Sequence, residues 1–199
     1  MLKAQDIING LQGIADKFSG LALLWHLLFY TLIIALIAGW VPSARLLAIL
    51  ISLPLLSVAT LALISGNPFN GTIFLVIFIL NCIFGLNADL QPATVSQPVF
   101  LVPGAVMIGF GLMYPHFVER SFIKYLSVSP AGLIPCPTLS VLIGFALIFN
   151  GFGSPSMLLV LILSGLFYGI FGVLKLAVYA DLFLIIGSIA LFVRYLILF

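Results

Sequence analysis

Few residues in this chain have side chains that could do chemistry, and five of them are expected near one level of the molecule. They are His26, Cys136, Tyr168, Lys175 and Asp181. Each lies inside or at the end of an apolar segment, where a polar group is costly unless it is paired or hydrated. A carboxylate and an imidazole at one depth could relay a proton or hold a cation. We therefore take His26, Tyr168, Lys175 and Asp181 as candidates for a ligand or ion pathway.

Each of these candidates also has an explanation without a functional role. Asp181 could begin a helix or pair with Lys175, because an acidic residue in a first helical turn gains from the helix dipole. His26 could be an interfacial histidine or a histidine with satisfied hydrogen bonds. Cys136, between Pro135 and Pro137, could form a rigid helix entry. A soft metal site made of His26, Cys136 and Asp181 is a further alternative.

Catalytic motifs give no support to an enzyme. The sequence contains no Gly-rich phosphate loop, no His-Glu-x-x-His helix and no Gly-x-Ser-x-Gly turn. Its five acidic residues leave little material for paired-carboxylate catalysis. No motif points to a cofactor. An enzymatic role is therefore a less favoured hypothesis than binding or transport.

The composition indicates the medium in which these residues lie. Hydrophobic residues make up 64% of the chain and charged residues only 6%, against about a quarter charged in soluble domains. Lipid can cover this apolar surface, whereas a water-soluble fold of this size could not hide it. The net charge of +2 comes without a basic tract, which argues against a nucleic-acid partner. The sequence thus predicts an integral membrane protein.

Apolar runs separated by turn residues predict an all-α transmembrane helical bundle of about seven spans. A span needs about 20 mainly apolar residues. The expected spans are 21–40, 44–64, 72–86, 98–114, 136–152, 157–174 and 176–195, with Pro54 and Pro103 as expected bends. The fifth is short, so spans five and six could instead form a re-entrant hairpin, which leaves five full crossings.

Residues 1–19 are expected to form an amphipathic helix in the membrane interface, ahead of a single transmembrane domain at 20–199. Ile7, Leu11, Ile14 and Phe18 form one apolar stripe on an otherwise polar segment. A frayed terminal helix is the alternative. A second short interfacial helix is expected within 115–135, with Val118, Phe122, Tyr125 and Leu126 on one face.

The positive charges predict the orientation. With seven spans, one side holds five of the seven basic residues, Lys3, Lys17, Arg120, Lys124 and Lys175, and the other holds Arg45 and Arg194. Because cytoplasmic loops are enriched in Lys and Arg, the N-terminus is expected inside and the C-terminus outside. The five-span alternative gives the same orientation.

Several segments of the C-terminal half carry a family resemblance. Tyr114-Pro115 closes one span, Pro135-Cys136-Pro137-Thr138 opens the next, and a Gly-rich helix precedes Ala180-Asp181. From Tyr114 to about Ala190 the chain resembles an uncharacterised bacterial family of multi-pass inner-membrane proteins, a domain of unknown function. The resemblance implies a helical bundle in a bacterial inner membrane, and it brings no established activity.

The sequence favours a small-molecule or ion transporter or channel-like protein as the function. The expected bends and the sparse ionisable residues at one mouth support it. The alternative is a non-catalytic scaffold or accessory subunit of a membrane complex, and an intramembrane enzyme or metal-handling protein comes third. Besides the lipid bilayer, a partner is a protein or a second copy bound through glycine-rich helix faces such as Gly165 and Gly169, four residues apart. Ordinary internal packing is the other explanation for these two glycines.

Overall fold

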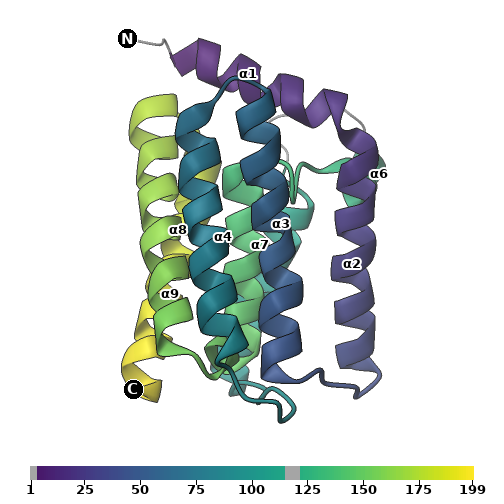
Figure 1. Ribbon diagram of the computed structural model, residues 1–199, viewed down its shortest axis with the longest axis vertical. Helices are drawn as coiled ribbons and strands as arrows, with labels where there is room; N and C mark the ends of the chain where they lie inside the picture. The colour runs from purple at the N-terminus through teal and green to yellow at the C-terminus, as the bar shows by residue number, and fades with distance from the viewer. Residues whose placement is uncertain (1–3, 115–121) are drawn as a thin grey trace.

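The chain folds as a bundle of helices in a computed structural model that describes residues 4–114 and 122–199 (Figure 1). All regular elements of these residues are helical, apart from one isolated bridge between Ser43 and Pro92. In chain order they are α1 (Ala4–Lys17), α2 (Ser19–Ile37), α3 (Ala44–Ile64), α4 (Pro68–Leu86), α5 (Pro98–Leu112), α6 (Phe122–Val128), α7 (Pro135–Ile148), η1 (Asn150–Gly153), α8 (Pro155–Leu176), η2 (Tyr179–Asp181) and α9 (Leu182–Leu198).

Five helical segments are long and apolar enough to cross a bilayer. They are α2, α3, α4, α8 and the segment Tyr179–Leu198, with 19 to 22 residues and mean hydropathies of 2.1 to 2.5. The apolar helices α5 and α7 have 15 and 14 residues, or roughly 21–23 Å at 1.5 Å per residue. A hydrocarbon core is about 30 Å thick. The chain is therefore a helical membrane protein with at least five helices of spanning length.

The helices stand side by side around α7, and α1 lies across one end of them (Figure 1). The most extensive packing is within three pairs, α3 with α4, α5 with α7, and α8 with α9. Of the 14 residues of α7, all but Cys136 are buried. The two chain ends lie at opposite ends of the bundle (Figure 1). Because its neighbours cover α7 on all sides, this short helix does not have to match the lipid thickness by itself.

Two glycines set the close approach of α5 and α7. A Cβ on Gly104 would lie 2.9 Å from the carbonyl oxygen of Gly144, and a Cβ on Gly144 would lie 2.6 Å from that of Gly104. Without side chains at these positions the two backbones can touch, as is common between membrane helices. The hydroxyl of Ser140 donates to the carbonyl of Met107 at 2.8 Å across the same contact.

The apolar stripe of α1 packs on the bundle. Leu11 and Ile14 are buried against a cluster that includes Ala22 of α2 and Leu176 of α8. The sequence predicts that this helix lies in the membrane interface, and in the structure much of its stripe covers the ends of other helices. An amphipathic helix buries its stripe against whichever apolar surface is nearest, and here the bundle provides that surface.

The structure corrects several expected boundaries. Helix α4 begins at Pro68, four residues before the expected span, because Asn67 caps it by accepting from the amide of Asn70 at 3.1 Å. Helix α8 continues to Leu176, and the chain then turns through Ala177, whose φ is +55°. Asp181 consequently precedes α9, whereas we expected it inside the last span. Part of the expected interfacial helix is α6, and Val118 lies outside the described residues.

A left-handed turn joins α7 to α8 at the end of the bundle opposite α1. Residues 150 to 153 all have positive φ, between 50° and 67°. Asn150 is fixed there because its side-chain oxygen accepts from Arg194 of α9 and from the hydroxyl of Ser96. Arg194 is buried and lies over the ring of Phe100, 4.8 Å from its centroid. These contacts from three segments hold a backbone conformation that is rare for side chains other than glycine.

Candidate functional site

The carboxylate of Asp181 is buried between three segments that are far apart in the sequence. Its side chain is 1% exposed. Oδ1 accepts a hydrogen bond from the hydroxyl of Tyr114 at 2.6 Å, and Oδ2 accepts one from the thiol of Cys136 at 3.2 Å. Although Asp181 precedes α9, its side chain makes no capping bond to that helix. Neither the helix-start explanation nor the Lys175 pairing describes this side chain, because both oxygens are directed into the bundle.

Local structure explains why these three groups meet. Tyr114 follows the end of α5, Cys136 lies in the first turn of α7, and Asp181 ends the short helix η2. Pro135 occupies the first position of α7, where a helix does not need a backbone amide as donor. Cys136 therefore lies in the first turn of α7, close to the end of the bundle. The turn at Ala177 directs the chain back over α8. All three residues therefore lie at the same end of the bundle.

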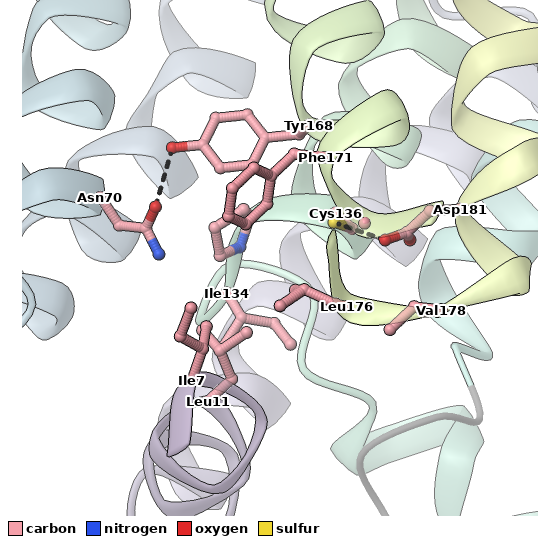
Figure 2. Close-up of a pocket in the computed structure, with 12 residues that line it drawn as sticks. Ile7, Leu11, Asn70, Ile134, Cys136, Tyr168, Phe171, Leu176, Val178 and Asp181 are labelled. Atoms are coloured by element: carbon pink, nitrogen blue, oxygen red, sulfur yellow. Dashed lines mark hydrogen bonds between the residues drawn. The ribbon is translucent and has the colours of Figure 1, made fainter. Parts of the chain in front are cut away.

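A small cavity borders the Cys136–Asp181 pair (Figure 2). Its volume is about 30 Å³, and a single water needs roughly 10–15 Å³. Ile7 and Leu11 of α1 form one side. The rest comes from Asn70 of α4 and from α7, α8, η2 and the residues next to them, among them Phe171 and Leu176. The space therefore fits one or two waters or a small ion, and it is too small for a metabolite.

A second polar pair lines the same cavity. Tyr168 of α8 donates from its hydroxyl to Oδ1 of Asn70 in α4, at 3.0 Å, and both side chains are buried. Figure 2 shows this pair on the far side of Phe171 from Cys136 and Asp181. Cys136, Asp181, Tyr168 and Asn70 thus give an otherwise apolar cavity its four polar side chains.

Two of the predicted site residues do not line this cavity. Nδ1 of His26 lies 2.8 Å from the carbonyl oxygen of Ala22, and Nε2 lies 3.2 Å from that of Leu112. His26 is therefore a buried histidine with backbone partners, which is the alternative explanation given above. Lys175 is exposed at the end of α8. The structure brings together Cys136, Tyr168 and Asp181.

The described residues include no group of three or more His, Cys, Asp or Glu side chains arranged to hold a metal ion. His26 lies apart from Cys136 and Asp181, so the three weak metal candidates do not form one site. Both cysteines are free thiols.

The glycine-rich face of α8 packs against α9 and η2. A Cβ on Gly165 would lie 2.2 Å from the hydroxyl oxygen of Ser188, and one on Gly169 would lie 2.7 Å from a side-chain carbon of Ile185. The internal-packing explanation thus describes both glycines. The same face continues to Gly172, which contacts the carboxylate of Asp181.

Sequence reasoning missed two members of the site. Tyr114 was noted only within the family resemblance, and Asn70 lies in a connection between two expected spans. The segments that carry the resemblance, at Tyr114, Pro135–Thr138 and Ala180–Asp181, meet at this carboxylate. Polar residues within a turn of an apolar helix end were the available signal, and their partners depend on how the helices are arranged.

Comparison of the chain with protein-family models, with curated proteins and with solved structures finds no match in any of the three.

Proposed function

We propose that this membrane protein transports a small ion, and that Asp181 is the group that binds and releases a proton on the way. The main support for this proposal is a buried carboxylate beside a water-sized cavity. Its two partners, Tyr114 and Cys136, are neutral donors, and no Lys or Arg of the described residues forms an ion pair with it. A carboxylate without a fixed cation can exchange a proton, whereas one in a salt bridge is held in its charged form.

The size of the cavity favours a proton over a larger substrate at this point. About 30 Å³ accommodates a water that could carry a proton to Asp181. Tyr168 and Asn70 add hydrogen-bonding groups to the cavity wall. Ile7 and Leu11 of α1 close it, so access depends on the end of the bundle that α1 covers.

We further propose seven crossings, with the N-terminus in the cytoplasm and the C-terminus outside, in a bacterial inner membrane. The chain ends at opposite ends of the bundle support an odd number of crossings (Figure 1). The lateral packing of α5 along α7 supports counting both short helices. The excess of Lys and Arg predicted for the α1 end supports the orientation. The resemblance of residues 114 to about 190 is the basis for the proposed relation to the uncharacterised bacterial family.

The direct test is proton flux into proteoliposomes that contain the purified chain and an internal pH-sensitive dye. A potassium gradient with valinomycin sets the membrane potential. We expect the wild-type chain to acidify the interior when it is made negative, and Asp181→Asn to lose this flux. Asparagine keeps the size of the side chain and an acceptor for Tyr114, but it cannot exchange a proton at this site.

Asp89→Asn is the matched control, because Asp89 is exposed in the connection after α4. It should transport like wild type. If Asp181→Asn folds and conducts protons as wild type does, the proposal is wrong. If neither chain conducts under any imposed potential, a proton pathway through this protein is excluded, and the role of a scaffold or accessory subunit takes its place.

The tight interior is the observation that favours this second role. All but one residue of α7 is buried, and the cavity at Asp181 is water-sized. A scaffold should purify with a partner in mild detergent. Recovery as a lone monomer under the mildest conditions would argue against it.

A further inference from the structure

Two larger pockets lie near the Asp181 cavity. The first, here called the groove, runs between Thr72, Val76 and Ile77 of α4 and Leu163, Ser164 and Phe167 of α8, with a volume of about 340 Å³. The second, here called the hollow, lies between α1 and the turn that precedes α4, with a volume of about 430 Å³. Both are much larger than the cavity at Asp181.

The groove is apolar and opens to the side of the bundle. Val76 and Leu163 at its edges are 50% and 65% exposed, and Ile77 in its floor is buried. Ser164 leaves space because its side chain is small, and its hydroxyl already donates to the carbonyl of Val160 at 2.6 Å. Because α4 and α8 both have spanning length, this groove faces the hydrocarbon of the bilayer.

The hollow is polar on the side of the turn. The polar part of its lining consists of Asp6 of α1 and of Ser65, Asn67 and Asn70 around the start of α4, and the rest, which includes Ile14, Phe69 and Phe171, is apolar. The polar residues present a carboxylate, a hydroxyl and two side-chain amides. They lie beyond the last turn of the apolar helix α3, at the level where a membrane presents its headgroups.

Two contacts join the residues that line the hollow to those that line the groove. Asn70 lines the hollow and bonds to Tyr168, which lines the groove. Phe69 lines the hollow and Phe167 lines the groove, and their ring centroids are 6.3 Å apart. The partly polar hollow therefore adjoins the apolar groove along the outside of the bundle.

We propose that one membrane phospholipid binds here, with its headgroup in the hollow under α1 and an acyl chain in the groove between α4 and α8. The order of polar and apolar surface along the site is that of an amphiphile. A groove that opens sideways into hydrocarbon meets lipid chains at far higher concentration than any other ligand. A helix of a partner protein in the groove would leave the polar side of the hollow unfilled. This site does not depend on proton exchange at Asp181.

The test uses the full chain in nanodiscs that contain a phosphatidylethanolamine with a photoreactive diazirine on its acyl chain. After illumination, mass spectrometry maps the labelled peptides. We expect label concentrated on the segments of α4 and α8 that face the groove, and loss of that label in Ser164→Phe, which fills the groove. Val102→Phe is the matched control, because Val102 is 67% exposed on α5 and belongs to neither lining. It should keep the wild-type labelling.

A second filling variant, Val76→Trp, enters the groove from α4 and replaces Ser164→Phe if that variant fails to fold. A photoreactive hydrocarbon without a headgroup should label the groove several-fold less than the phospholipid does. Label spread evenly over all exposed helices would overturn the proposal, as would label that persists in a folded filled variant. Cross-links between two copies of the chain across the groove would overturn it in favour of a dimer interface.

Discussion

The carboxylate of Asp181 occupies space that Gly172 leaves open. A Cβ placed on Gly172 would lie 1.8 Å from Oδ2 of Asp181, a distance at which one of the two groups has to move. Gly172 lies one turn before the end of α8, and Asp181 follows the left-handed turn at Ala177. The helix and the turn together hold the carboxylate between Tyr114 and Cys136. The site therefore depends on the lack of a side chain as well as on the polar groups themselves.

Gly172→Ala should displace the carboxylate and abolish proton flux while α8 stays helical. The added methyl collides with the carboxylate of Asp181, so the bonds to Tyr114 and Cys136 are expected to break. Gly109→Ala is the control, because a Cβ there meets nothing within 4 Å, and alanine in a helix is favoured over glycine by about 0.5–1 kcal/mol. Thermal unfolding in detergent and the liposome assay report both effects. Wild-type flux in folded Gly172→Ala would contradict the site geometry.

Tyr114→Phe should lower the free energy of unfolding by about 1–3 kcal/mol, because it leaves a buried carboxylate oxygen without its donor. Tyr114 is fully buried and phenylalanine fills the same space, so lost packing contributes little. Tyr179→Phe is the matched control, since Tyr179 is 71% exposed. Denaturant titration of both variants separates the two positions. Equal stabilities would mean that the Tyr114 bond to Asp181 does not contribute.

Arg194→Leu should lower the free energy of unfolding by about 1.5–3 kcal/mol, the range for hydrogen bonds to charged groups. It removes the two Arg194 donors to Asn150 in the left-handed turn and leaves only the hydroxyl of Ser96. Arg194→Lys should recover little of the lost stability, because an ammonium lacks the planar fork of donors and stacks less well on Phe100. Arg45→Lys, at a half-buried residue with one bond to the carbonyl of Ala88, should change stability less. Full recovery in Arg194→Lys would show that charge alone is sufficient.

Asn81→Leu should raise the free energy of unfolding by about 1 kcal/mol. The amide nitrogen of Asn81 donates within its own helix to Ile77 at 2.8 Å, and Oδ1 is buried without a partner among the described residues. A buried polar atom without a hydrogen bond costs free energy, and an apolar side chain of similar size removes that cost. Asn81→Asp should have the opposite effect. Destabilisation by leucine would indicate an additional partner for Oδ1.

The helical fold could be predicted largely from the sequence, because each apolar run carries its own information. A segment such as Ala44–Ile64 contains enough hydrophobic residues to require lipid or protein around it, and its expected and observed bounds coincide. Polar turn residues mark most of the other boundaries to within a few positions. The largest differences are at the start of α4, at the end of α7, which stops at Ile148, and at the start of the last helix. The first depends on the capping bond from Asn67, and the last depends on the left-handed turn at Ala177.

The site was only partly predictable, for a physical reason. Position along a helix gives depth in the membrane, and it brought Cys136, Tyr168 and Asp181 to one level. Rotation and packing decide which side chains at that level touch, and these follow from close contacts such as Gly104 with Gly144 and Gly172 with Asp181. Sequence alone therefore determined that this is a helical membrane protein with polar residues near one end. Only the tertiary structure decided that Tyr114 and Cys136 bind the carboxylate while His26 bonds to backbone elsewhere, because the angles between helices are set by contacts between residues far apart in the chain.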